Sequence, residues 1–195
     1  MNFNQWRDYG RGLFFEFFKR PEQALKAYRD ALQHNPGFLQ AARCLGYLHA
    51  QRHEYQDAED YYLLVLRIHA QEVDTWFNLG YIRDHAGRHA QAIDAFQEAI
   101  KHNPKHDRAW YGLGLAHAAL GQHEKAADAL QHAAELQPMN GHAWYALGMA
   151  YHHHHQPEKV KEVALHLSRF DPALTRRLVQ ESERADLSHL IRDLR

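Results

Sequence analysis

Four consecutive histidines, 152–155, lie within the segment YHHHHQPEKV and are the residues most suggestive of chemistry in this chain. Imidazole nitrogens are common ligands for zinc and other transition metals. A helical metal site needs ligands that converge on one point, commonly a pair of histidines four residues apart plus further groups. Tyr151 and Gln156 occupy the positions that would complete such pairs, and only His152 and His155 are three residues apart.

Successive residues of a helix point about 100° apart, so four adjacent histidines cannot all face one ion. We therefore expect no metal site and no cofactor, with His152, His153 and His155 as the weak candidates for a metal. Histidine is nevertheless abundant, at 18 of 195 residues. Its role depends on the elements that carry these side chains.

The composition is that of an ordinary globular protein, with 45% hydrophobic and 24% charged residues and a net charge of −1. The chain has no excess of positive charge, so we expect no nucleic-acid partner. It has no run of 18 apolar residues, so we expect no stable membrane insertion. Cys44 is the only cysteine, which excludes an intrachain disulfide and suits a reducing compartment. The N-terminus lacks the pattern of a secretory signal, so we expect a cytoplasmic protein.

Equivalent residues recur along the chain at one constant interval, the distance in sequence from Gly12 to Gly46. We call this interval the repeat length. Four residue classes keep it, namely the glycines Gly12, Gly46, Gly80, Gly114 and Gly148, the tryptophans Trp76, Trp110 and Trp144, the alanines Ala24, Ala58, Ala92 and Ala126, and the prolines Pro36, Pro104, Pro138 and Pro172. Ala70 stands where a proline is missing and Val160 where an alanine is missing. Such periodicity predicts a repeat protein whose units stack on their neighbours.

Each unit contains two amphipathic helices. In the unit that begins at Asp107, apolar residues recur every three or four positions on both sides of Gly121, and Pro138 ends the second stretch. We expect the periodic glycines and alanines where two helices approach closely, because a larger side chain would force them apart. Tryptophan and leucine then fill the wider gaps.

The motif resembles the tetratricopeptide repeat family, since Trp76, Leu79-Gly80, Ala92, Phe96, Ala99 and Pro104 follow the order of its characteristic residues. The resemblance implies an all-α, right-handed solenoid of stacked antiparallel helix pairs, the tetratricopeptide superhelix, with a C-terminal capping helix. The expected units span residues 5–38, 39–72, 73–106, 107–140 and a degenerate fifth at 141–174, followed by a capping helix and amphipathic tail at 175–195. In the first unit, Asp8 and Arg11 replace the usual Trp and Leu.

The repeat pattern also gives the histidines an ordinary explanation. The first helix of the last unit is expected to end near His153, so the four histidines lie across a helix end and the following turn. His49 and His117 fall where the family usually has a packed aromatic residue.

The resemblance implies that the concave face, which the first helices line, binds a peptide or helix of a partner. On this chain the peptide-binding groove is expected to carry Tyr9, Arg43, Tyr47, Asp74, Phe77, Asn78, Tyr81, Asp84, Arg108, Tyr111, Tyr145 and Met149. Tyrosine provides contact area at low entropic cost, although the same residues could simply pack against the next helix. Arg43, Asn78 and Arg108 match three of five positions of a chaperone-tail clamp, but Tyr47 and Gly112 break it, so we expect no such clamp.

The stretch GLFFEFFKR is a second candidate surface, through Phe14, Phe15, Phe17 and Phe18. Four phenylalanines in five helical positions cannot all be buried by one neighbour, so we expect a partner or a second copy of the chain there. The alternative is that residues 1–4, with Phe3, fold over them. At the other end, Leu187, Leu190, Ile191 and Leu194 either extend the cap or form a short docking helix.

No catalytic motif is present, neither a phosphate-binding glycine loop nor a nucleophile or zinc signature. We therefore expect a non-catalytic adaptor or scaffold that binds another protein. Two alternatives remain open, a histidine-rich metal- or haem-binding protein and a chaperone for a secreted or membrane-associated client.

Overall fold

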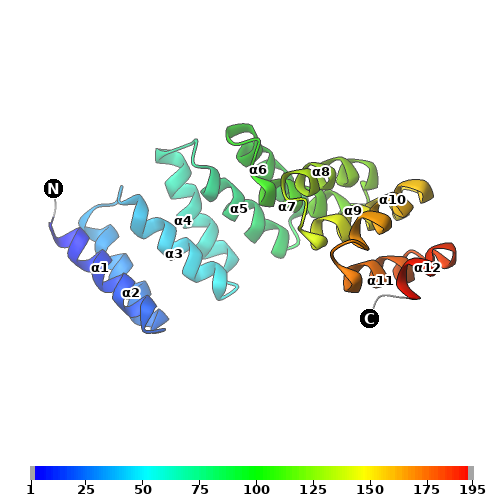
Figure 1. Cartoon of the computed structure of the whole chain (residues 1–195). Coiled ribbons are helices and arrows are strands. Elements are labelled where there is room, and N and C mark those ends of the chain that lie inside the picture. The colour runs from blue at the N-terminus through cyan, green and yellow to red at the C-terminus, as the bar shows by residue number, and fades with distance from the viewer. Residues whose placement is uncertain (1–2, 193–195) are drawn as a thin grey trace. The chain divides into compact units, whose positions relative to one another are not determined.

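The computed structural model describes residues 3–192, which form α-helices and one short 3-10 helix and contain no strand (Figure 1). None of the helices within these residues combines the length and apolar composition needed to cross a bilayer. Leu194 of the expected tail lies outside the described residues. The all-α solenoid of helix pairs that the repeat predicts is observed. The chain divides into two compact units, Met1–Arg88 and His89–Arg195, which are described in turn.

The N-terminal unit contains five helices, α1 (Phe3–Phe17), α2 (Pro21–His34), α3 (Leu39–Gln51), α4 (Tyr55–Ile68) and α5 (Val73–His85). Each helix packs on the next along the chain, and α3 also contacts α5. The core between α1, α2 and α3 is formed by small and large apolar side chains, including the fully buried Ala24, Tyr28 and Leu45. The first helices α1, α3 and α5 therefore present one set of side chains each to the same face of this unit.

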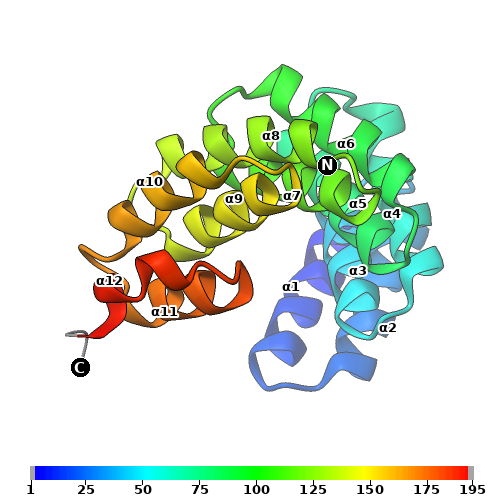
Figure 2. The ribbon, with the colours of Figure 1, turned by 90° about the vertical axis from the view of Figure 1, so that its right-hand side faces the viewer.

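The C-terminal unit contains the remaining helices, α6 (His89–His102), α7 (Asp107–Ala119), α8 (His123–Leu136), α9 (Gly141–His153), α10 (Pro157–Leu167), α11 (Pro172–Glu181), η1 (Ala185–Leu187) and α12 (His189–Arg192). Helix α11 contacts both α9 and α10, as Figure 2 shows. Leu178 and Leu187 are almost fully buried there, and Leu190 and Ile191 pack on the same core. The described part of the tail therefore packs on α11 and on the core of this unit.

The periodic glycines lie where two helices approach most closely. A Cβ atom added to Gly46 would lie 2.6 Å from the ring of Tyr62, and one added to Gly12 would lie 2.3 Å from the ring of Tyr28. Gly114 has the same relation to Leu130, at 2.5 Å. Because both tyrosines are 0–1% exposed, their rings have no space to move into. The expectation that glycine marks close helix approach is confirmed at these positions.

The periodic tryptophans tie each first helix to the loop before it. The indole Nε1–H donates to a backbone carbonyl six residues earlier in three successive repeats, from Trp76 to Ala70 at 2.7 Å, from Trp110 to Pro104 and from Trp144 to Pro138, both at 2.9 Å. The accepting residue is the one at the proline position. Ala70 can replace proline because only its carbonyl oxygen is needed for this bond.

The first helix of every repeat is followed by a residue with left-handed backbone, one repeat length from the next such turn. These residues are Lys19 (φ 55°), His53 (60°), Gly87 (75°), Gly121 (71°) and His155 (55°). The amide after each bonds the carbonyl five residues back, as from Gln156 to Tyr151 at 2.9 Å, which is the Schellman arrangement. His155 therefore occupies a backbone position that favours glycine, while His154 caps α9.

Asp8 occupies the tryptophan position in the first repeat. Its side chain is 2% exposed and forms ion pairs with Arg7 and Arg11, both at 3.1 Å, and lies 3.2 Å from His34. The hydrogen bond from Arg7, with support from Arg11, holds the pKa of this buried carboxyl below its usual range. Arg11 thus has a structural function at the position where other repeats have leucine.

Replacing Gly46 with alanine should destabilise the N-terminal unit by about 1–3 kcal/mol, because the new methyl group overlaps the immobile ring of Tyr62. Gly37→Ala is the matched control, since its Cβ would meet only ordinary contacts, the nearest at 3.5 Å. Urea denaturation followed by circular dichroism measures both. Equal stabilities of the two variants would contradict the packing described here.

Replacing His155 with glycine should stabilise the C-terminal unit by about 1 kcal/mol, because glycine adopts the left-handed conformation without a steric penalty. His154→Gly should have the opposite sign, since His154 has φ of −89° and glycine only adds freedom to the unfolded chain. Thermal unfolding of the two variants checks the pair. A fall in melting temperature for His155→Gly would refute this account of the turn.

Candidate functional site

One repeat position on the first helices exposes an apolar side chain in each repeat of the N-terminal unit. These are Leu13 on α1, Tyr47 on α3 and Tyr81 on α5, with exposed fractions of 46, 49 and 45%. They lie one repeat length apart, so each has the same place on its helix. We refer to these three residues as the ladder. Exposed large apolar side chains at regular spacing are typical of a surface that binds another chain.

Local contacts orient the two tyrosines of the ladder. Gln51 donates from Nε2 to the Tyr47 hydroxyl at 2.7 Å, one helical turn away. The ring of His85 lies 4.0 Å from that of Tyr81 and its Nδ1 is 3.0 Å from the Tyr81 carbonyl oxygen. These contacts restrict the orientation of both tyrosine rings, while nearly half of each side chain stays accessible. An ordered aromatic ring loses little entropy when a ligand covers it.

Other residues expected in the groove of this unit have partners within the unit. Tyr9 is half-buried against Phe38 and Tyr28, with ring centroids 5.4 and 5.7 Å apart, and burial raises the pKa of its hydroxyl. Arg43 forms an ion pair with Glu72, which also accepts a hydrogen bond from Thr75 at 2.9 Å. An acidic ligand would therefore have to compete with Glu72 for Arg43.

The remaining expected residues of α5 differ in exposure. Asp74 is exposed, whereas Phe77, Asn78 and Asp84 are half-buried. The structure thus places all of them on α5, the helix that carries Tyr81.

In the C-terminal unit the expected groove residues are partly covered. Arg108 is exposed on α7, and Tyr111 and Met149 are half-buried against the core of this unit. Tyr145 is engaged by the capping helix, since its hydroxyl donates to Glu181 and the guanidinium of Arg177 lies 4.8 Å above its ring. Burial, and then the hydrogen bond to Glu181, raise the pKa of Tyr145 to about 12. The cap therefore satisfies the polar end of this tyrosine internally.

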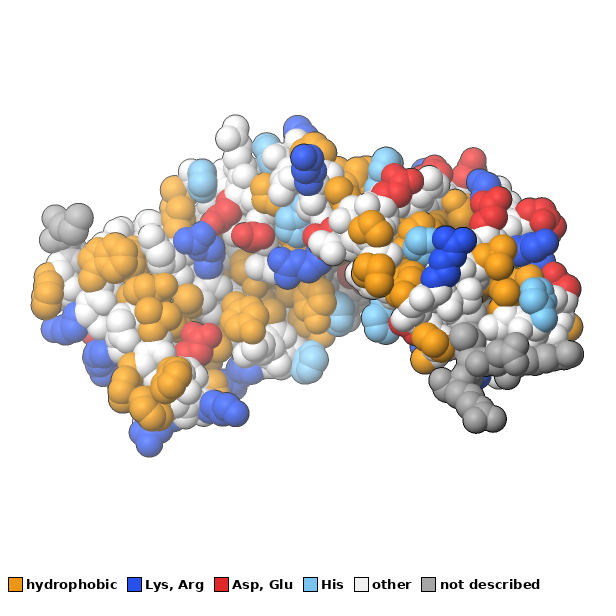
Figure 3. All heavy atoms as spheres, viewed as in Figure 1, with side chains coloured by type: hydrophobic (Ala, Val, Ile, Leu, Met, Phe, Trp, Pro, Cys, Tyr) orange, Lys and Arg blue, Asp and Glu red, His pale blue; other side chains and the backbone are white. Residues whose placement is uncertain are grey.

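A second accessible surface is formed by phenylalanines of α1 and the turn after it. Phe3, Phe14, Phe17 and Phe18 have exposed fractions of 77, 56, 81 and 54%, and we call these four residues the phenylalanine patch. Phe15 is half-buried and packs on the core, in contrast to the other three of the expected set. Figure 3 shows hydrophobic side chains gathered over this region, bordered by Lys and Arg. Because Phe3 is itself exposed, it does not cover the others, and residues 1–2 lie outside the described part.

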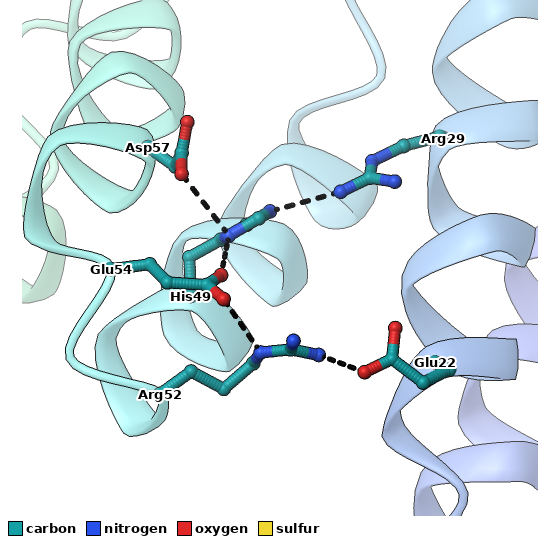
Figure 4. Close-up of polar contacts among 6 residues, drawn as sticks. All are labelled: Glu22, Arg29, His49, Arg52, Glu54 and Asp57. Atoms are coloured by element: carbon teal, nitrogen blue, oxygen red, sulfur yellow. Dashed lines mark hydrogen bonds and ion pairs between the residues drawn. The ribbon is translucent and has the colours of Figure 1, made fainter.

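A buried histidine joins three helices of the N-terminal unit through polar contacts (Figure 4). His49 is 5% exposed, and its Nδ1 lies 2.6 Å from Glu54 Oε2 and 3.9 Å from Asp57 Oδ2. Arg29 of α2 approaches its Nε2 at 3.5 Å. Because a carboxylate only accepts, Nδ1 must donate to Glu54, which leaves Nε2 free to accept from Arg29. The hydrogen bond from His49, followed by that from Arg52, lowers the pKa of Glu54.

His49, Glu54 and Asp57 are the one group of three potential metal ligands that the described residues bring together, with ligand atoms within 4.8 Å of one another. An ion there would have to displace the proton between His49 and Glu54 beside the guanidinium groups of Arg29 and Arg52. Arg52 also pairs with Glu22 of α2. The arrangement is therefore accounted for as an ionic network that fastens α2 to α3 and α4. Sequence reasoning placed His49 in the core but missed its partners.

Comparison with known families decides the classification. The family model for the tetratricopeptide repeat matches residues 18–73, 69–101, 77–138 and 119–159, which together span most of the chain. The chain belongs to the tetratricopeptide repeat family. A search among curated proteins returned no match.

Solved tetratricopeptide structures share the fold at low sequence identity. A crystal structure of MamA has a TM-score of 0.80 and 21% identity, covering 96% of this chain and 98% of its own. YrrB, described as a tetratricopeptide protein with an unusual peptide-binding site, has a TM-score of 0.77 and 20% identity, covering 90% of each chain. PilF from Pseudomonas aeruginosa has a TM-score of 0.75 and 17% identity, covering 95% of this chain and 87% of its own.

The tetratricopeptide fold accounts for many of the histidines. His132 and His166 occupy one repeat position and stack on Trp110 and Trp144, with ring centroids 4.4 and 4.0 Å apart. His117 repeats the geometry of His49 with a neutral partner, its Nδ1 lying 2.7 Å from Gln122 Oε1. His132 and His166 thus contact the tryptophan rings, and His117 forms a hydrogen bond within its own repeat.

The weak metal candidates lie at the end of α9, where the rings stack and do not converge. The rings of His123 and His153 are 4.9 Å apart and inclined by only 27°, and His152 lies next to His153 at 5.2 Å. Imidazole lone pairs lie in the ring plane, so two nearly parallel stacked rings do not direct them at a common ion. His155 is exposed in the left-handed turn. Within residues 3–192, none of these three belongs to a group of three converging ligands.

His123 should make the C-terminal unit less stable in acid. Its Nδ1 is buried without a hydrogen-bond partner, and burial, then the neighbouring His153, His154 and His155, lower its pKa below the ordinary 6.5. A histidine with a lowered folded-state pKa stabilises the fold above pH 6.5, and this stability is lost as the pH falls through the folded-state pKa, because the unfolded chain binds the proton more readily.

We therefore expect His123→Gln to flatten the decrease in melting temperature between neutral pH and about pH 5.5. Differential scanning calorimetry of both proteins across this range measures the effect. Parallel curves for wild type and variant would show that His123 does not contribute to the acid sensitivity.

Proposed function

We propose that this protein is a non-catalytic adaptor that binds a segment of a partner protein along the ladder of its N-terminal unit. The observation that carries the proposal is the recurrence of Leu13, Tyr47 and Tyr81, each nearly half exposed, at one repeat position on three neighbouring first helices. A row of accessible side chains at one repeat position offers an elongated contact surface, which suits a chain segment better than a compact small molecule.

The spacing of the ladder indicates the form of the ligand. Packed helices lie about 8–10 Å apart, and an extended peptide advances about 3.3 Å per residue. Successive residues of the ladder would then contact every third residue of an extended peptide. The ligand expected is a peptide with apolar or aromatic side chains at that interval, whose contacts are mainly with Tyr47 and Tyr81.

The charges beside the ladder refine this expectation. Arg43 is already paired with Glu72 of the same unit. An acidic residue flanking the apolar positions of the peptide would therefore gain little from Arg43. This distinguishes the proposed ligand from the acidic chaperone tails whose clamp the sequence matches only in part.

The similar structures support a binding role in general terms. YrrB carries a peptide-binding site by its own description, and it has the fold of this chain. The family membership and the exposed ladder together favour recognition of a protein segment over a chemical reaction, and the proposal assigns no reaction to the chain.

Changing Tyr47 and Tyr81 together to serine should reduce partner capture at least tenfold, because it removes two aromatic contacts worth roughly 1 kcal/mol or more each. Quantitative mass spectrometry after affinity capture from native lysate identifies the partners, and titration of a peptide from the strongest one gives the affinities.

Leu165→Ser is the matched control, since Leu165 is 39% exposed on the second helix α10 and lies off the ladder. It should leave capture unchanged. If the same partners bind the double tyrosine variant with wild-type affinity, the ladder is not the binding surface.

A further inference from the structure

The face of α1 that bears Phe14 corresponds to a face that is buried in every other repeat. The residues at this repeat position are Phe14, Leu48, Ile82, Ala116 and Ala150, each one repeat length from the next. The last four are 0–4% exposed, whereas Phe14 is 56% exposed. A large aromatic residue at the open end of a repeat array is unusual, because terminal repeats normally present polar residues to solvent.

The position of Arg7, on the same face of α1, is also exposed in the first repeat and buried in the later ones. Its residues in the later repeats, Ala41, Thr75, Ala109 and Ala143, are 0–1% exposed, whereas the side chain of Arg7 is 51% exposed. Phe3, Arg7, Gly10, Phe14 and Phe17 follow one another at intervals of four and three residues. This spacing places them along one stripe of α1, as in helices that pack on another helix.

Gly10 lies in the middle of this stripe and leaves a gap in it. A Cβ added to Gly10 would have no atom within 4 Å among the described residues. The residue at the equivalent repeat position on α7, Gly112, is covered by the ring of Phe96 from the preceding helix α6, whose Cζ would lie 2.6 Å from an added Cβ. The space above Gly10 is thus empty, whereas the equivalent space above Gly112 is filled by a phenyl ring.

We propose that two copies of the chain dimerise through α1, with Phe14 of each copy inserted against Gly10 of the other. Gly10 and Phe14 are one helical turn apart, so a two-fold axis between antiparallel α1 helices brings both pairs together at once. The same register places Arg7 opposite Phe17 of the second copy, a favourable cation–π arrangement. The inserted side chain, Phe14, and the gap that receives it, at Gly10, both belong to this chain. A second copy is therefore the partner that fits this surface.

At the other end of the described residues, the cap covers the last helix pair. Leu178 of α11 covers Gly148 of α9, with its methyl carbon 2.7 Å from an added Cβ, and Leu178 is 0% exposed. The face of the last helix pair is therefore already occupied by the cap. This disfavours head-to-tail stacking into a filament and favours the closed, isologous dimer.

The accessible area is sufficient for a reversible dimer. The four rings of the phenylalanine patch are on average about two thirds exposed. At roughly 200 Å² per ring, they offer about 500 Å² per copy, or about 1,000 Å² in the dimer. Interfaces of this size lie at the lower end of specific association, so the dimer should dissociate in the micromolar range.

Sedimentation velocity over a concentration series of the full chain tests the proposal. The wild type should shift from monomer to dimer, and Phe14→Ser should weaken association at least tenfold without unfolding the protein, because the side chain is exposed in the monomer. Met139→Ser, at a 73% exposed residue in the C-terminal unit, is the control and should dimerise as the wild type does.

Gly10→Ala separates this arrangement from other contacts. Alanine should raise the melting temperature of the monomer, since the helix gains stability and nothing obstructs the methyl group, yet it should weaken the dimer by filling the pocket for Phe14. A monomeric wild type at the highest concentration, or a dimer unaffected by Phe14→Ser, would overturn the proposal. Weakening by Phe14→Ser but not by Gly10→Ala would overturn the register. The ladder lies outside all three changes, so partner capture through Tyr47 and Tyr81 is tested independently.

Discussion

The close approach of two helices at periodic glycines such as Gly46 and Gly114 is the constraint on which the rest of the structure depends. Where Gly46 faces Tyr62, or Gly114 faces Leu130, there is no room for even a methyl group. The alanines on the opposing helix, such as Ala58 and Ala126, are completely buried for the same reason. This contact sets the distance within each pair, and the tryptophan hydrogen bonds to the preceding loop then set the start of the next pair. The exposed residues of the ladder are evenly spaced because these internal contacts recur at the same interval.

Most of the fold could be predicted from the sequence because its determinants recur at a fixed interval. Residues such as Gly114, Trp110 and Ala126 each predict a contact to a neighbour that is close in the chain, and repetition makes the pattern unambiguous. The first repeat shows where such reasoning stops. Asp8 departs from the pattern, and only the coordinates reveal that Arg7 and Arg11 neutralise it in a buried position.

The site was less predictable, because accessibility depends on what other elements cover. Tyr47 and Tyr145 are both expected on the concave face, yet Tyr47 is exposed and Tyr145 is held by Glu181 and Arg177 from a helix that belongs to no repeat. His49 could be assigned to the core, but its link to Arg29 crosses between repeats and has no sequence signature. The four histidines, by contrast, were correctly placed at a helix end, since the repeat spacing alone determines where α9 stops.

The left-handed turn after each first helix has a consequence for how this gene can change. Because the turn, the tryptophan bond and the glycine contact all return after one repeat length, an internal duplication or loss of one whole repeat would join chemically equivalent ends. An insertion of any other length would interrupt this constant spacing between equivalent contacts. Unequal recombination can therefore lengthen or shorten such a protein in steps of one helix pair.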